Sequence, residues 1–164
     1  MQRSDLISLL AQRLPDAAVR IEEMPNNDIM LQVERQDFIA VVTILKKDRE
    51  LGFNALTNQL GVDYGDRFAV ICNLYSFAID NKLTVKVFLE KEDPEIDSIE
   101  QLFRGANWFE RETYDLLGIR FKGHGNLERL LLPADWDGHP LRKDYVYPET
   151  YHSLGLKRKT LFED

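Results

Sequence analysis

The sequence predicts an α+β domain, in which a mostly antiparallel or mixed sheet of about five strands carries packed helices and precedes an extended, irregular C-terminal tail. Three observations support this prediction: short runs of alternating apolar residues, stretches with apolar residues at helical spacing, and a loss of periodicity after residue 118. A chain of 164 residues has the length of one domain and can bury a sizeable core. We therefore expect a core over residues 1–118 and a docking tail over 119–164, continuous with the core.

Three segments have the pattern of amphipathic helices. The first is Ser4–Leu14, whose first residue is a candidate N-cap. The second begins at Asp37, and its apolar face is formed by Phe38, Val41, Val42 and Leu45. The third is predicted from Ser98, where Gln101 completes a capping box, and Gly105 is expected to divide it.

Five runs have the composition of strands, with turn residues between them. The segment 56–64 also fits a short helix, but we favour a strand. Turn-forming residues at 25–28 and 80–81 predict that the first two runs form one hairpin and the last two form another. The five predicted strands are 19–24, 29–33, 56–64, 67–79 and 83–90.

The helix beyond Gly105 has an unusual distribution of charge. Glu110 falls in the middle of its apolar face, whereas Trp108, Arg111 and Asp115 fall on the other face. A buried carboxylate needs a partner, so we expect a cationic or backbone group beside Glu110. A large aromatic side chain on a polar face suggests a surface that another protein covers.

Composition excludes several classes of function. The net charge of −7 and the pI of about 5.0 disfavour non-specific nucleic-acid binding, which needs a positive face. The single cysteine, Cys72, permits neither an intramolecular disulfide nor a cysteine cluster for a metal. We see no secretory leader, and no apolar run approaches the roughly 20 residues that span a bilayer. Membrane association is therefore expected to be indirect, through another protein.

Two groups of side chains are candidates for catalysis or metal binding. Glu110, Glu112 and His124 could form a general acid/base set, but no nucleophile signature accompanies them. We favour instead an ion-pair network of these carboxylates with Arg104, Arg111 and Arg129. A metal site would have to combine His124, His139 and His152, which lack the local spacing of helical metal sites. No phosphate-binding glycine loop is present.

Residues 108–145 closely resemble the small peripheral-arm subunit of respiratory complex I, the C-type subunit of bacterial NADH–quinone oxidoreductase. Four elements carry the resemblance, in order along the chain. They are Glu-Arg-Glu-x-x-Asp-x-x-Gly at 110–118, Phe-x-Gly-His at 121–124, Leu-x-Arg-Leu-Leu-Leu at 127–132, and Trp-x-Gly-x-Pro-Leu-Arg-Lys-Asp-Tyr at 136–145. The first hundred residues resemble the family mainly in their pattern of elements.

The resemblance implies a structural or assembly subunit without a catalytic site or cofactor of its own, with FMN and iron–sulfur clusters on partner subunits. Its partners would be the hydrogenase-like large subunit that helps form the quinone pocket and the iron–sulfur subunits. It would lie peripherally on the cytoplasmic face of the bacterial inner membrane. We expect an ion-pair network at the helix end, formed by Glu110, Arg111, Glu112, Asp115 and Arg129. We expect partner contacts from Trp108, Arg111, Trp136, Arg142, Lys143, Asp144 and Tyr145.

Two alternatives remain at this point. Membrane-bound hydrogenases and deazaflavin-dependent dehydrogenases contain related subunits with the same motifs, and the partner that supplies electrons distinguishes them. A stand-alone hydrolase that uses Glu112 and His124 is an alternative of another class. Turnover by the purified chain, abolished by His124→Ala, would support that alternative.

Overall fold

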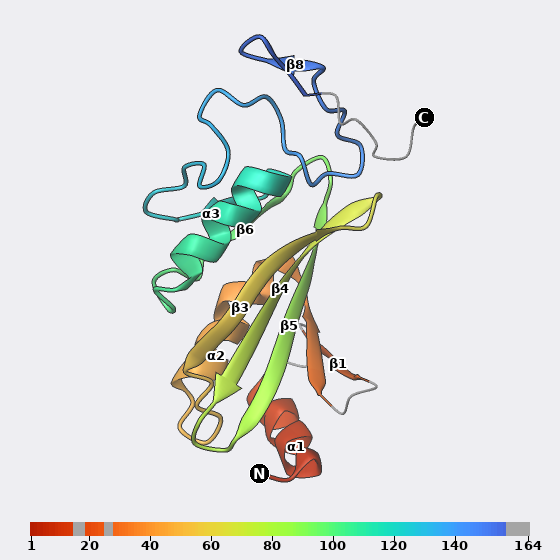
Figure 1. Cartoon of the computed structure of the whole chain (residues 1–164). Coiled ribbons are helices and arrows are strands. Elements are labelled where there is room, and N and C mark those ends of the chain that lie inside the picture. Colours follow the sequence, from red (N-terminus) through yellow and green to blue (C-terminus); the bar gives the residue numbers. More distant parts are fainter. Residues whose placement is uncertain (15–18, 25–27, 157–164) are drawn as a thin grey trace, which may run out of the picture.

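The central element of the computed structural model is a five-stranded sheet (Figure 1). Neighbouring strands run antiparallel except β2 and β5, which are parallel. The sheet is therefore mixed, and the predicted α+β class is confirmed. In spatial order the strands are β1 (Val19–Glu23), β2 (Ile29–Val33), β5 (Asn81–Glu90), β4 (Arg67–Ser76) and β3 (Ala55–Asp63). The structure describes residues 1–14, 19–24 and 28–156.

Both predicted hairpins form, and alternation is the reason that the sequence reveals them. In the β4–β5 hairpin, Phe68 pairs with Leu89 and Leu74 pairs with Leu83, and all four side chains are buried on one face. Successive side chains of a strand point to opposite faces, so every second residue of these strands joins the core. The ambiguous segment 56–64 is a strand, as favoured, and forms the β3 edge of the sheet.

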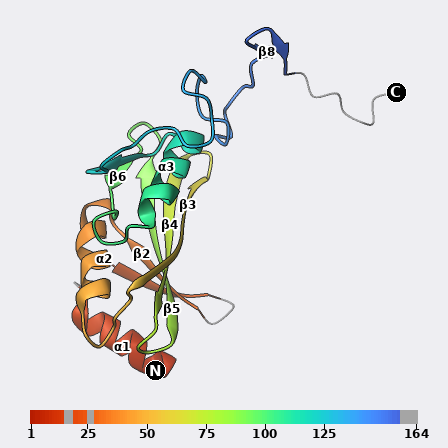
Figure 2. The same cartoon turned by 60° about the vertical axis from the view of Figure 1, so that its left-hand side comes forward.

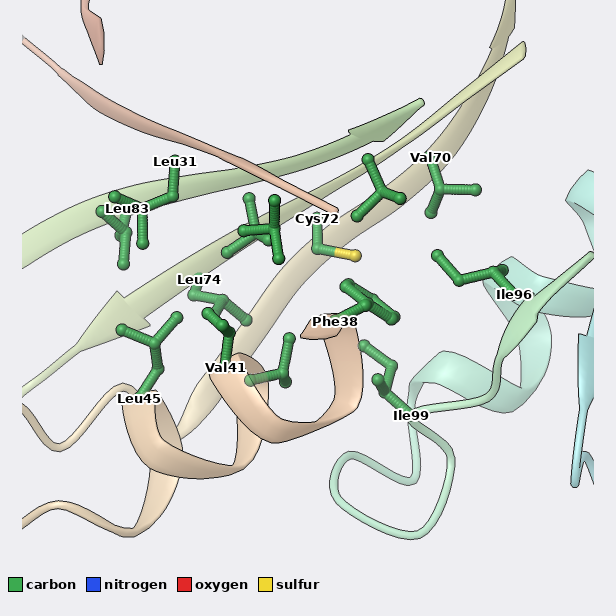
Figure 3. Packing of buried hydrophobic residues seen from close by; sticks show 14 of the residues in the cluster. Leu31, Phe38, Val41, Leu45, Val70, Cys72, Leu74, Leu83, Ile96 and Ile99 are labelled. Atoms are coloured by element: carbon green, nitrogen blue, oxygen red, sulfur yellow. The ribbon is translucent and has the colours of Figure 1, made fainter. Parts of the chain in front are cut away.

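Three helices lie on the same side of the sheet (Figure 2). They are α1 (Arg3–Arg13), α2 (Phe38–Lys47) and α3 (Ala106–Leu117). In the core, Phe38 and Val41 of α2 lie against Cys72 and Leu74 of β4 (Figure 3). The predicted Asp37 cap is not made: a short 3₁₀ turn, Arg35–Asp37, leads into α2 and the carboxylate forms no capping bond. Ser4 likewise does not cap α1, which begins one residue earlier.

The prediction of a helix from Ser98 is wrong. A short strand, β6 (Glu95–Asp97), precedes Ser98, turns follow it, and α3 begins only at Ala106. Ser98 Oγ accepts the amide of Glu100 at 3.1 Å, which closes a tight turn in place of a capped helix. The segment also buries Ile96, Ile99 and Phe103 in the core. Their spacing of i, i+3 and i+7 fits a helix, so the apolar pattern did not reveal the strand and turns.

The tail begins later than residue 119. Strand β7 (Arg120–Lys122) pairs in parallel with β6, and Ile119 and Phe121 are buried in the core. Beyond β7 the chain is irregular apart from a small hairpin of β8 (Thr150–Tyr151) and β9 (Leu154–Gly155). We use "tail" below for residues 123–156. None of the helices in the described part of the chain is long and apolar enough to cross a membrane.

Candidate docking site

Helix α3 is placed by a glycine on the edge strand. A Cβ atom on Gly61 of β3 would lie 2.6 Å from Leu117 Cδ1 and 2.7 Å from Thr113 Cγ2. Contacts this short are forbidden, so only glycine lets α3 approach β3 this closely. The close approach brings the C-terminal end of α3 to the end of the sheet where the tail begins.

Asp115 anchors the tail to α3. Its side chain is fully buried, and Oδ2 accepts the backbone N–H groups of Leu130, Leu131 and Leu132 at 3.0, 2.7 and 2.9 Å. Its other oxygen pairs with Arg129 Nη1 at 2.8 Å. Burial favours the neutral carboxyl, but these hydrogen bonds outweigh it and hold the pKa of Asp115 below its ordinary value. The carboxylate therefore organises four donors from one stretch of the tail.

Arg129 closes the first loop of the tail. Besides Asp115, its guanidinium donates to the carbonyls of Trp136 at 2.9 Å and Gly138 at 3.0 Å. One planar group thus joins α3 to two points that lie seven and nine residues further along. Tyr145 supports the same loop, because its hydroxyl donates to the Asp137 carbonyl at 2.9 Å.

Gly118, the residue that ends α3, forms the seat for two tail side chains. Its φ is +74°, and a Cβ atom there would clash with Arg142 Nη2 and lie 2.5 Å from the His139 ring. His139 Nδ1 donates to the Asp115 carbonyl at 2.9 Å, and Arg142 Nε donates to the Leu117 carbonyl at 2.6 Å. Burial is the main cause that lowers the pKa of His139, with Arg142 and Arg129 nearby adding to the effect.

The tail thereby completes the C-terminal cap of α3. The last four carbonyls of a helix have no partner within the helix. Here the Tyr114 carbonyl accepts the Gly118 amide at 2.8 Å, and the Leu116 carbonyl accepts the amide of Leu141 at 3.0 Å. The two remaining carbonyls are those of Asp115 and Leu117, which His139 and Arg142 satisfy. The positive charge of Arg142 also suits the negative end of the helix dipole.

Residues 142–144 are held on the sheet as well. Asp63, at the end of β3, accepts the Lys143 amide at 2.8 Å, and Lys91 pairs with Asp144 at 3.0 Å. The Arg142 guanidinium lies 5.3 Å from the centre of the Phe68 ring. Of the residues predicted to contact partners, Arg142 and Asp144 therefore have partners within the chain, while the Lys143 side chain is exposed.

Glu110 is fully buried, and its partners are neutral. Its oxygens accept the hydroxyl of Ser98 at 2.5 Å, the amide of Ile99 at 2.9 Å and the side-chain amide of Gln59 at 3.4 Å. Burial dominates over these bonds and raises the pKa of Glu110. The backbone partner was one of the two expected possibilities, and no ion pair forms within the part of the chain described. Glu112 is exposed, and no hydrogen bond or ion pair reaches it from the residues described.

The candidate acid/base and metal groups considered in the sequence are not brought together among the residues described. His124 uses both ring nitrogens on the backbone: Nε2 donates to the Asn107 carbonyl, and Nδ1 accepts the Asn126 amide. His152 lies against Asp135, with Nε2 and Oδ2 2.6 Å apart, and His139 is held by α3. Among the residues described, no group of histidine, cysteine and carboxylate side chains is arranged to hold a metal ion.

The outer surface of α3 and the tail is rich in exposed apolar side chains. Trp108 is 59% exposed and lies against the guanidinium of Arg111, whose nitrogens donate to the carbonyls of Glu128 and Arg129. Trp136 is half-buried against Tyr151. We define the docking surface as the exposed apolar residues of this region: Trp108, Leu131, Leu141, Val146, Tyr147, Leu154 and Leu156.

Sequence reasoning identified Trp108 but missed the others. The sequence did contain a sign of these residues. Leucine, valine and tyrosine side chains in a segment without periodicity belong to no predicted helix or strand that would bury them in the core. It also missed Asp63 and Gln59, and it considered His139 only as a metal ligand. The partners of all three lie far away in the sequence.

Comparison with known proteins gives a consistent result. Residues 31–151 match the family "Respiratory-chain NADH dehydrogenase, 30 Kd subunit". The chain is 40% identical over 147 residues to the NADH-quinone oxidoreductase C subunit of Roseiflexus sp. (strain RS-1), covering 88% of this chain and 84% of that protein. It is 44% identical over 139 residues to the corresponding subunit of Chloroherpeton thalassium, covering 82% of this chain but only 58% of that longer protein.

The fold agrees with a solved relative. The trypsin-resistant fragment of Nqo5 superimposes with a TM-score of 0.66 at 29% sequence identity, covering 77% of this chain and all of that fragment. The family match covers the sheet from β2 onward, α3 and the tail through β8. The chain therefore belongs to the 30 kDa subunit family of respiratory-chain NADH dehydrogenases.

Proposed function

We propose that this chain is a non-catalytic structural and assembly subunit in the peripheral arm of a proton-translocating NADH–quinone oxidoreductase. In this proposal its tail docks on the hydrogenase-like subunit that helps form the quinone pocket, near the iron–sulfur subunits. FMN and the iron–sulfur clusters are carried by those partners. The chain lies peripherally on the cytoplasmic face of the inner membrane and reaches it through the complex.

One observation carries the docking role: the tail directs several of its polar groups inward onto α3 while it exposes large apolar side chains. Arg129, Arg142 and the backbone of 130–132 are all used on α3, whereas Leu131 is 63% exposed and Val146 is 85% exposed. An ordered segment that exposes several large apolar side chains is typical of a protein interface. The hydrolytic alternative has weaker support, because His124 is engaged by backbone groups and Glu112 lies exposed.

The test replaces exposed side chains without disturbing the anchors. Leu131→Glu and Val146→Glu leave the backbone bonds to Asp115 in place and put a charge on the docking surface. Phe77→Glu is the matched control, because Phe77 is 72% exposed and directly follows β4, which ends at the opposite end of the sheet from the tail (Figure 1). Each variant replaces the native chain in cells, and the assembled complex is quantified on native gels.

We expect Val146→Glu and Leu131→Glu to lower the amount of assembled complex at least about tenfold, since a buried unpaired charge at an interface costs several kcal/mol. Phe77→Glu should assemble normally. Normal assembly of both tail variants would refute docking through this surface. Mass spectrometry of the co-purifying subunits identifies the large subunit, and a nickel-bearing or deazaflavin-linked partner would move the chain to one of the related complexes.

A further inference from the structure

The five-stranded sheet has a second face, which no helix of the described chain covers. Helices α1, α2 and α3 all lie on the opposite side (Figure 2). The uncovered face carries every second residue of each strand, including Ile71 of β4 and Phe88 of β5. We call it the open face. It is distinct from the docking surface, which lies on α3 and the tail.

Apolar side chains gather on the open face where β3, β4 and β5 run together. Across the strands, Leu60 is opposite Ile71, and Val62 is opposite Ala69, which in turn is opposite Phe88. Beside them Tyr64 is 44% exposed, and its ring lies 5.8 Å from that of Phe88 in an edge-to-face arrangement. We define the open-face patch as Leu60, Val62, Tyr64, Ile71 and Phe88. All five are partly or largely exposed.

Two cations lie on this patch. Lys86 Nζ is 4.5 Å from the centre of the Phe88 ring and donates to the Tyr64 hydroxyl at 3.0 Å. The Arg67 guanidinium lies 4.2 Å from the same Phe88 ring. Within the described residues Lys86 forms no ion pair with a carboxylate, and Arg67 has only the exposed side chain of its neighbour Asp66 at 3.8 Å. The two cations are therefore positioned by aromatic rings and remain available to an external carboxylate.

The charge of the open face differs in sign from that of the chain. Its strand positions hold four cations, Arg20, Arg67, Lys82 and Lys86, and two carboxylates, Glu22 and Glu90. The whole chain has a net charge of −7. A positive face on an acidic protein attracts a negative partner and gives binding that weakens with added salt.

The other half of the open face shows that exposed apolar residues are not required there by the fold. In that half, Thr84 donates to Asn73 Oδ1 at 2.9 Å, so polar side chains satisfy one another across β4 and β5. Both halves cover the same core of buried residues on the far side of the sheet. The apolar character of the patch therefore needs a reason other than folding.

We propose that the open-face patch is a second protein-docking surface, which receives an acidic segment of another subunit. Carboxylates of that segment pair with Lys86 and Arg67, and its apolar side chains lie on Ile71 and Phe88. An anionic lipid surface is a poorer fit, because it calls for a dense basic cluster, and here Asp66 and Glu90 border the cations. The inference rests on the proposed function only in that the chain works within a larger assembly.

The test uses site-specific cross-linking in the native complex. Ile71→p-benzoylphenylalanine places a photoreactive group at the centre of the patch, and a second chain carries the same group at Trp108 to report on the docking surface. Each is combined with the double variant Arg67→Glu with Lys86→Glu. The control double variant is Lys47→Glu with Arg49→Glu, which makes the same change in net charge at exposed positions in and just after α2, away from the open face.

We expect the group at position 71 to cross-link to a carboxylate-rich stretch of another subunit. Reversal of Arg67 and Lys86 should lower that yield about tenfold, and the α2 control should leave it unchanged. The cross-link from position 108 should persist in every variant, so loss of both cross-links would indicate failure of tail docking instead. A position-71 cross-link to lipid alone, to a second copy of this chain or to no partner would overturn the proposal. The proposal would also be overturned if reversal of Arg67 and Lys86 left the cross-linking yield from position 71 unchanged. Lys86→Met should retain the native melting temperature, which shows that the fold tolerates loss of this charge.

Discussion

The fully buried Asp115 and the partly buried Arg129 form an ion pair, with 2.8 Å between Oδ1 and Nη1, and each partner also binds the backbone of the tail. Asp115 holds the three amides that follow Arg129, and Arg129 holds two carbonyls further on. Neither side chain can be removed without leaving the other's buried charge uncompensated. The pair thus attaches the tail to helix α3, and we call it the joint between them.

Asp115→Asn should loosen this joint while leaving the sheet folded. An asparagine presents one acceptor oxygen in place of two and leaves the Arg129 charge unpaired, which costs about 3 kcal/mol for a buried pair. Hydrogen exchange of the Leu130, Leu131 and Leu132 amides should quicken, and proteolysis should begin within residues 123–145. Glu112→Gln removes the same charge at an exposed position, and equal exchange in the two variants would contradict the assigned role of Asp115.

Gly118→Ala should destabilise the chain for two separable reasons. A left-handed conformation costs a residue with a Cβ about 1–2 kcal/mol, and here the added atom would also collide with Arg142 and His139. Gly65→Ala isolates the first cost, because Gly65 has a φ of +99° and nothing within 4 Å of the added atom. Chemical denaturation should show a clearly larger loss for Gly118→Ala, and equal losses would mean that the tail does not pack on Gly118.

Glu110 should make stability fall as pH rises. Its folded-state pKa is raised above the ordinary value of 4.5, so the folded chain holds this proton more tightly than the unfolded chain. The contribution of Glu110 to stability is therefore fully present below pH 4.5 and is lost as pH rises from there through the raised pKa. Glu110→Gln keeps the acceptor for Ile99 and offers an N–H to Ser98, so its melting temperature should lack this decrease. An unchanged pH profile in Glu110→Gln would show that the carboxyl ionises freely.

Asp115 should change stability with pH in the direction opposite to Glu110. Its pKa lies below the ordinary 3.8, so it stabilises the fold above that pH and the contribution disappears as pH falls through the lowered pKa. The Asp115→Asn variant should therefore lose the part of the acid-side decline in stability that Asp115 contributes. Parallel acid-unfolding curves followed by circular dichroism would test this, with Glu112→Gln, at an exposed carboxylate, as the control.

Arg142 and Lys143 should behave differently, although they are adjacent. Arg142→Ala removes a bond to the Leu117 carbonyl and should increase proteolysis of the tail in the isolated chain. Lys143→Ala changes only an exposed side chain, because its anchoring bond to Asp63 comes from the backbone. A loss of complex assembly in Lys143→Ala, with a tail that resists protease, would identify a direct partner contact; a tail weakened equally by both changes would exclude this division of roles.

Local patterns predicted the sheet well. The alternation in β4 and β5 persists over ten residues in each strand, and the buried face follows it without a break. The region around Ser98 was misjudged because a capping box reports only on neighbours about three residues apart. It carries no information that Glu110, twelve residues away, takes the Ser98 hydroxyl.

The sequence predicted which segments form the site, but not which way their side chains point. The motifs from 108 to 145 located α3 and the tail, and the phase of α3 predicted a buried Glu110. The sequence could not reveal that Arg142 turns inward to Leu117 while Leu131 faces outward, because those directions depend on contacts between residues far apart in the chain. Asp63 and Lys143, for example, are separated by 80 residues.

The shared cap of α3 also sets an order on synthesis. The carbonyls at the end of the helix are satisfied by residues up to Arg142, so the cap of α3 is complete only after the ribosome has added 25 further residues beyond Leu117 and released them from its tunnel. The nascent chain therefore presents a finished sheet before a finished helix. A chaperone or partner subunit that binds only the capped end of α3 would therefore bind only after the tail has been translated.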